Sequence, residues 1–118
     1  LRNAATARSR MALAAGAMRA ALVDHARRRA AQKRGEGIAP LTVVETAAAQ
    51  RDAYLVALDE ALSELALVDP QLSHLVELRF FGGLPNEAVA RELALSPRTV
   101  KRRWLLAKAW LHRRILGP

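Results

Sequence analysis

The sequence contains no cysteine, and aromatic residues make up only 4% of its 118 residues. Without thiols it can form neither a disulfide framework nor a thiolate metal site, and it fits a reducing compartment such as the cytoplasm. No apolar run approaches the roughly 20 residues that a membrane-spanning helix requires, and nothing in the sequence resembles a signal peptide. We therefore expect a cytoplasmic protein without a membrane partner.

Residues that could carry catalysis are scattered. His25, His74 and His112 are scattered, with no second histidine at helical metal-binding spacing, and no phosphate-binding loop or nucleophile motif surrounds the serines. We expect no enzymatic activity, no metal and no cofactor.

The composition favours helices, because the 52% hydrophobic content is rich in alanine and poor in β-branched residues. We predict an all-α fold with a long N-terminal helix, a linker, and then a four-helix bundle. The predicted helices cover residues 6–34, 52–68, 71–81, 87–94 and 97–116. Residues 35–50 are assigned to the linker, although Thr42 and Glu45 have capping-box spacing, so the second helix could begin there instead of near Arg51.

The N-terminal helix carries a narrow apolar stripe of Met11, Ala15, Met18 and Leu22, which Ala26 continues weakly. A lone helix cannot bury its own stripe. The C-terminal bundle, a second copy of the chain, or no partner at all remain as alternatives for this face.

Charge is segregated along the chain. Residues 1–34 carry nine basic side chains against one acid, residues 35–97 carry three against ten, and residues 98–118 carry seven with no acid. A polyanion would meet the two basic ends and be repelled by the acidic middle.

A helix-turn-helix motif is predicted at residues 87–116. Ser96 is a strong N-cap and Pro97 suits the first helical position, so a helix should begin there. Val100, Trp104, Ala107 and Leu111 form its buried stripe, and Val89, Ala90 and Leu93 form that of the preceding helix. Such a basic second helix enters the DNA major groove. The predicted DNA-binding residues are Ser96, Arg98, Thr99, Lys101, Arg102 and, at the margin, Arg103.

Residues 78–115, LRFFGGLPNEAVARELALSPRTVKRRWLLAKAWLHRRI, resemble region 4 of bacterial extracytoplasmic-function (ECF) sigma factors. The resemblance implies that this part reads the −35 promoter element and contacts the RNA polymerase core, with helices 52–81 including the polymerase-facing side. Ala94 stands where this family usually has glycine, which requires a left-handed residue or a different turn.

Residues 17–35, AMRAALVDHARRRAAQKRG, are similar to the end of region 2 in a subgroup of the same family. The resemblance implies −10 or phosphate contacts, for which the candidates are Arg27, Arg28, Arg29, Lys33 and Arg34. Asp24 is expected to pair with Arg27 or Arg28 one turn later. Because the likeness begins partway through region 2, we expect the chain to be a fragment.

The sequence thus predicts the end of region 2 at residues 1–34, a tether at 35–50, and region 4 at 51–118. The expected function is that of an ECF-type sigma factor directing RNA polymerase to promoters. The alternatives are a helical protein–protein interaction module, binding an anti-sigma factor or a second copy through the N-terminal helix, and a helix-turn-helix regulator of another family.

Overall fold

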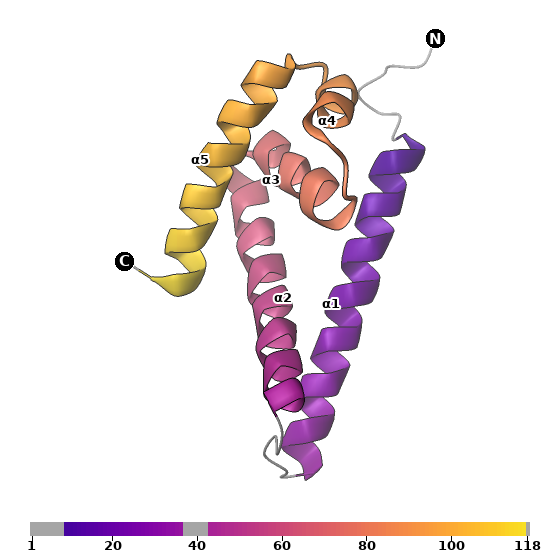
Figure 1. Cartoon of the computed structure of the whole chain (residues 1–118), viewed down its shortest axis with the longest axis vertical. Coiled ribbons are helices and arrows are strands. Elements are labelled where there is room, and N and C mark those ends of the chain that lie inside the picture. The colour runs from indigo at the N-terminus through magenta and orange to yellow at the C-terminus, as the bar shows by residue number, and fades with distance from the viewer. Residues whose placement is uncertain (1–8, 37–42, 118) are drawn as a thin grey trace.

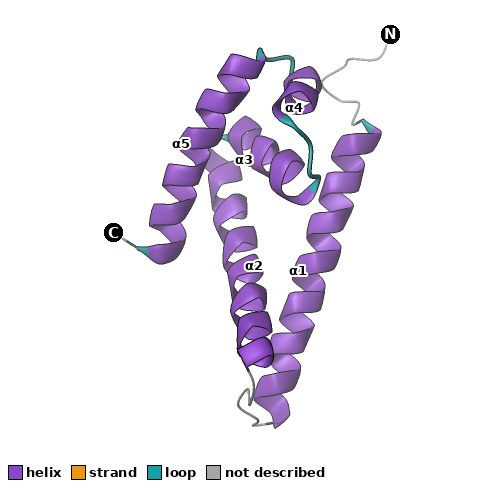
Figure 2. Cartoon of the chain, in the orientation of Figure 1, coloured by secondary structure: helices purple, strands orange, loops and turns teal. Residues whose placement is uncertain are grey.

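The computed structural model describes residues 9–36 and 43–117, and every regular element in these ranges is helical. The elements are α1 (Arg10–Glu36), α2 (Val43–Val68), α3 (Pro70–Val76), the π-helical segment η2 (Glu77–Phe81), α4 (Asn86–Leu93) and α5 (Pro97–Leu116). The predicted all-α class is confirmed for these residues, none of which lies in a strand (Figure 2). None of these helices is both long and apolar enough to cross a membrane.

The two longest helices, α1 and α2, run antiparallel and lie side by side (Figure 1). Helix α3 and η2 follow at the far end of α2, and α4 and α5 complete the helix-turn-helix. Asp69 ends α2 and caps α3, since its carboxylate accepts a hydrogen bond from the backbone N–H of Leu72 at 3.0 Å. Pro70 then occupies the first position of α3, where its missing N–H costs nothing.

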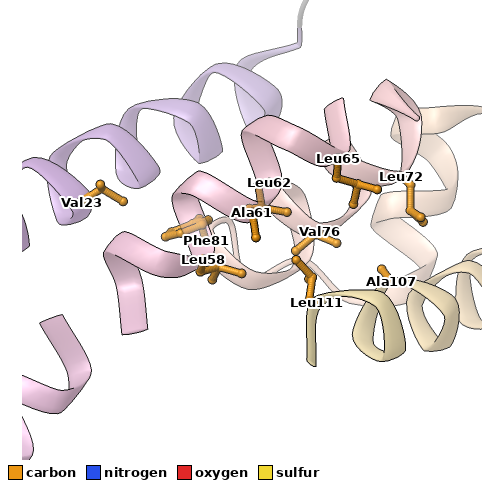
Figure 3. Close-up of a cluster of buried hydrophobic side chains, with 10 residues drawn as sticks. All are labelled: Val23, Leu58, Ala61, Leu62, Leu65, Leu72, Val76, Phe81, Ala107 and Leu111. Atoms are coloured by element: carbon orange, nitrogen blue, oxygen red, sulfur yellow. The ribbon is translucent and has the colours of Figure 1, made fainter. Parts of the chain in front are cut away.

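The main hydrophobic core lies between α2, α3 and α5 (Figure 3). Its buried residues are Val23, Leu58, Ala61, Leu62, Leu65, Leu72, Val76, Phe81, Ala107 and Leu111. A second cluster joins α1, α3, η2, α4 and α5, and contains Ala12, Ala15, Leu75, Leu78, Val89, Ala90 and Val100. Trp104 packs against both clusters, so α5 is held by the stripe that the sequence predicted.

Helix α1 packs on the C-terminal helices, which selects one of the three alternatives for its partner. The predicted face, however, is wrong. Met11, Met18 and Leu22 are each more than 40% exposed, and of the predicted stripe only Ala15 and its continuation Ala26 are buried. The buried residues of α1 are Ala12, Ala15, Val23 and Ala26.

Small side chains are selected on α1 because the helix passes close to η2. A Cβ atom added to Gly82 would lie 3.1 Å from the Cβ of Ala15, and one added to Gly16 would lie 3.9 Å from the Glu77 carboxylate. Methionine or leucine on this face would not fit between the two backbones.

Two predicted helix boundaries also change. Helix α2 begins at Val43, so residues 43–50 are helical instead of part of a linker, as the alternative start near Thr42 allowed. Helix α1 begins at Arg10 instead of residue 6, with Ser9 accepting a hydrogen bond from the Ala12 N–H at 3.0 Å. Residues 6–8, Thr42 and the rest of the linker from 37 lie outside the described residues.

Ala94 adopts the left-handed conformation that its place in the turn requires, with φ 56° and ψ 44°. Its N–H donates to the carbonyl oxygen of Ala90, as does the N–H of Leu95 at 2.9 Å. The turn therefore keeps the geometry of a glycine C-cap with a residue whose Cβ makes that geometry costly.

Replacing Ala94 with glycine should remove this strain. We expect Ala94→Gly to raise the free energy of unfolding by about 0.5–1 kcal/mol, the left-handed penalty less the entropy of the unfolded glycine. Thermal unfolding followed by circular dichroism measures the change. The matched control is Ala109→Gly, an exposed position inside α5, which should lower stability by about 1 kcal/mol. Equal losses in both variants would contradict the interpretation of the turn.

Candidate nucleic-acid interface

The first turn of α5 is built by Ser96. Its hydroxyl accepts a hydrogen bond from the N–H of Thr99 at 3.1 Å and donates to the Thr99 hydroxyl at 2.9 Å. Both hydroxyl-bearing residues of the predicted site therefore have local structural roles. They fix where the helix begins and so where the basic side chains after it point.

Three of the predicted site residues form an exposed basic face on this end of α5. Arg98, Lys101 and Arg102 are all exposed, and within the described part of the chain no acidic side chain pairs with them. The structure thus brings them together on the surface, opposite the buried stripe that contains Val100.

This arrangement opposes the helix macrodipole. The N-terminus of a helix carries partial positive charge and is stabilised by acidic residues, yet the first turn of α5 contains none. The backbone N–H groups and the basic side chains there instead concentrate positive charge at one place. Such a helix end attracts anions, and phosphate above all.

Arg103 departs from the predicted role, because it points back into the protein. Its Nη2 donates to the Asp69 carboxylate at 2.7 Å, and its side chain is 25% exposed. Since Asp69 also caps α3, one carboxylate links the start of α3 to the middle of the recognition helix. We interpret Arg103 as a residue that positions α5.

A second arginine that the sequence pattern did not single out also positions α5. The guanidinium of Arg79 lies 4.7 Å from the ring centroid of Trp104, and its Nη1 donates to the Asn86 side chain at 3.0 Å. This residue ties η2 to α4 and α5. In the sequence, Arg79 is marked only by its place beside a run of apolar residues. That place does not predict Trp104 or Asn86 as its partners.

The candidate phosphate contacts on α1 are distributed differently. Arg27 pairs with Asp59 at 3.4 Å and Arg29 with Asp52 at 3.2 Å, both on α2. Arg28 pairs with Asp24 at 3.2 Å, which confirms the predicted contact within the helix. The side chains of Lys33 and Arg34 lie outside the described residues. The C-terminal half of α1, which carries these arginines, lies toward the opposite end of the molecule from the first turn of α5 (Figure 1).

An apolar groove of about 280 Å³ lies on another side of α5. It runs between α2, η2 and α5, and its walls include Tyr54, Phe80, Trp104 and Leu116. Tyr54 and Phe80 are each 45% exposed, so the groove is open to solvent. Glu64 lies elsewhere on α2 and receives a hydrogen bond from Arg114 at 3.0 Å, which lowers the pKa of its carboxyl group.

Asp69 offers a test of how α5 is held. Desolvation raises the pKa of its carboxyl group, but the hydrogen bonds from Arg103 and from the Leu72 N–H, with the charge of Arg103, outweigh it and leave the pKa below its ordinary value. A carboxyl group with a lowered folded-state pKa stabilises the fold above its unfolded pKa of about 3.9. That contribution is lost as the pH falls through the folded-state pKa.

We expect Asp69→Asn to lower the free energy of unfolding at pH 7 by about 0.2–1 kcal/mol, because asparagine keeps the cap but loses the ion pair. The difference from wild type should shrink below about pH 4. Asp69→Ala should cost about 1 kcal/mol more, since it also removes the cap. Urea unfolding at several pH values measures both. A difference between Asp69→Asn and wild type that stays constant down to pH 3 would contradict the role of the ion pair.

The family model described as ECF sigma factor matches residues 4–116, nearly the whole chain. No curated protein and no solved structure matches the chain significantly. The family match confirms the resemblance drawn from residues 78–115 and 17–35, and it removes a helix-turn-helix regulator of another family as an alternative. The chain therefore belongs to the ECF sigma factor family, whose members are non-enzymatic transcription initiation factors that have the RNA polymerase core and promoter DNA as partners.

Proposed function

We propose that this chain directs RNA polymerase to promoters by placing the N-terminal turns of α5 in the major groove of the −35 element. In this proposal residues 51–118 act as region 4 and residues 1–34 as the end of region 2, in the cytoplasm. The observation that carries the proposal is the exposed face of Arg98, Lys101 and Arg102 on a helix end whose backbone also attracts anions.

The roles of the three residues follow from their chemistry. An arginine can grip guanine O6 and N7 with two hydrogen bonds, which discriminates between bases by about 1–3 kcal/mol. Lys101 is a point charge that suits phosphate as well as guanine. Leu105, exposed one turn later, can contact a thymine methyl group. Ser96 and Thr99 contribute by fixing the start of the helix, and Arg103 through Asp69 by fixing its orientation.

Replacing Arg98, Lys101 and Arg102 together with glutamine should weaken binding to a −35 duplex at least a hundredfold at low salt, because each substitution deletes a cation that meets a phosphate or a base. The slope of log affinity against log salt should fall by about one for each phosphate that is no longer neutralised. Fluorescence anisotropy with the RNA polymerase core present measures both.

The matched control is the triple variant Arg10→Gln, Arg51→Gln, Arg113→Gln, which removes the same charge from exposed positions elsewhere. It should change affinity by less than tenfold. Unchanged DNA affinity in the Arg98, Lys101, Arg102 variant would rule out the proposal and leave the protein–protein interaction module as the alternative.

We also propose that the apolar groove contacts the polymerase core. Its walls come partly from α2, α3 and η2, which belong to the helices 52–81 that the family resemblance implies to include the polymerase-facing side, and partly from α5. The groove combines exposed aromatic side chains with a concave shape, as surfaces that receive a partner's apolar side chains do.

A negative charge in the groove should therefore weaken polymerase binding. We expect Tyr54→Asp and Leu116→Asp each to lower the affinity for the core at least tenfold, because binding of the core would remove the new carboxylate from water. Binding titrations with labelled chain measure the affinity. Leu67→Asp, at an 86% exposed position of α2 outside the groove, is the control and should have little effect. Equal effects at all three positions would place the polymerase contact elsewhere.

A further inference from the structure

Helix α1 reaches the C-terminal helices through an arginine that is nearly enclosed. Arg19 donates from Nε to the Asp59 carboxylate at 2.7 Å and from Nη1 to the Glu77 carboxylate at 3.2 Å. Its Nη2 donates to the Asp59 carbonyl oxygen at 3.0 Å and to the Ser63 hydroxyl at 3.2 Å. Its side chain is 17% exposed, so the hydrogen bonds to Asp59 and Glu77 are partly buried, while the one to Ser63 is exposed.

The same face of α2 holds two further arginines of α1. Arg27 lies 3.4 Å from Asp59 and 3.8 Å from Glu60, and Arg29 lies 3.2 Å from Asp52, whose side chain is 9% exposed. We name the four carboxylates of Asp52, Asp59, Glu60 and Glu77 the acidic face. Arg27 and Arg29 are two of the residues proposed to contact nucleic-acid phosphate. In this structure they pair with carboxylates instead.

The interface between α1 and its neighbours is specific in shape but has a small apolar area. Ala15 lies against Gly82 at the end of η2, where an added Cβ atom would be only 3.1 Å away, and the Ser9 hydroxyl donates to Glu92 of α4 at 2.6 Å. The buried apolar side chains that α1 contributes are three alanines and Val23. A helix of 27 residues held by so little apolar area depends on its ion pairs, and ion pairs weaken as salt or a competing anion is added.

We propose that the acidic face is an intramolecular binding site for Arg19, Arg27 and Arg29 of α1. We further propose that single-stranded nucleic acid competes with the acidic face for Arg27 and Arg29. This inference rests on the proposed function in that it takes these arginines to be phosphate contacts. In this structure α1 packs against α2 and η2. When a phosphate backbone takes the arginines, the acidic face no longer has its partner and α1 separates from α2.

The absence of cysteine makes the motion measurable in the 118-residue chain itself. Cysteines introduced at Ala21 of α1 and Ala66 of α2, both exposed, can carry a donor and an acceptor dye. At low salt we expect one high-efficiency population. Adding an oligothymidine should convert it to a low-efficiency population, and added sodium chloride should do so without DNA. Binding of the oligothymidine with no change in energy transfer would overturn the competition.

A binding experiment tests the same inference through the acids. Asp52→Asn with Glu60→Gln should raise the affinity for oligothymidine about fivefold, because Arg29 loses its carboxylate partner and Arg27 keeps only Asp59. In an Arg27→Gln, Arg29→Gln background the same acid substitutions should change affinity no more than Glu64→Gln with Glu87→Gln, which removes two exposed acids from outside the acidic face. A gain that persists without the two arginines would overturn the inference, since it would be a general charge effect.

The two experiments separate this inference from the function on which it rests. If Arg27→Gln with Arg29→Gln leaves the affinity of the acid-neutralised chain for oligothymidine unchanged, the proposed phosphate contacts of α1 are wrong. The proposed competition is then wrong as well. If the same substitutions weaken binding but energy transfer never changes, the phosphate contacts stand and the competition alone is wrong.

Discussion

Helix α2 has to satisfy two neighbours of different chemistry at once, and the rest of the molecule is arranged around that requirement. One side carries Leu58, Leu62 and Leu65 into the core against α3 and α5. The other presents carboxylates and Ser63 to the arginines of α1. The leucine side fixes where the helix-turn-helix lies, and the acidic side fixes where α1 lies. Because both sides belong to one rigid helix, the position of α1 relative to the recognition helix is set through α2.

The C-terminal helices were predictable because their signals are local. A serine-proline pair sets the start of α5, an apolar residue every third or fourth position sets its buried face, and the position of Ala94 in the turn sets its left-handed backbone. Each of these depends on a few neighbouring residues. The basic residues of α5 could be placed on one exposed face for the same reason, whereas the partner of Arg103 lies 34 residues away in the sequence and left no local trace.

The face of α1 was not predictable from periodicity, because hydrophobic patterns give most weight to large side chains. Met11, Met18 and Leu22 form the better stripe, but α1 is selected for close approach to η2 and for ion pairs with α2. Close approach favours small side chains and ion pairing favours arginine, and a hydrophobic pattern gives little weight to either. Segregated charge along the chain was the available signal, and we interpreted it as attraction for a polyanion alone. The acidic middle proves to be a partner of the basic N-terminal segment within the fold.

The segment η2 gives this small protein a length constraint. Its π-helical turn closes through the hydrogen bond from the Gly82 N–H to the Glu77 carbonyl oxygen at 3.1 Å, which spans one residue more than an α-helical bond. The turn ends where the chain meets Ala15 of α1 and then leads into α4. Removing one residue would let this turn close as an ordinary α-helical turn, whereas adding one would rotate everything after it by about 100° about the helix axis. Phe81 would leave the core and the helix-turn-helix would face another direction. The number of residues in this segment, more than their identity, therefore determines where α5 points.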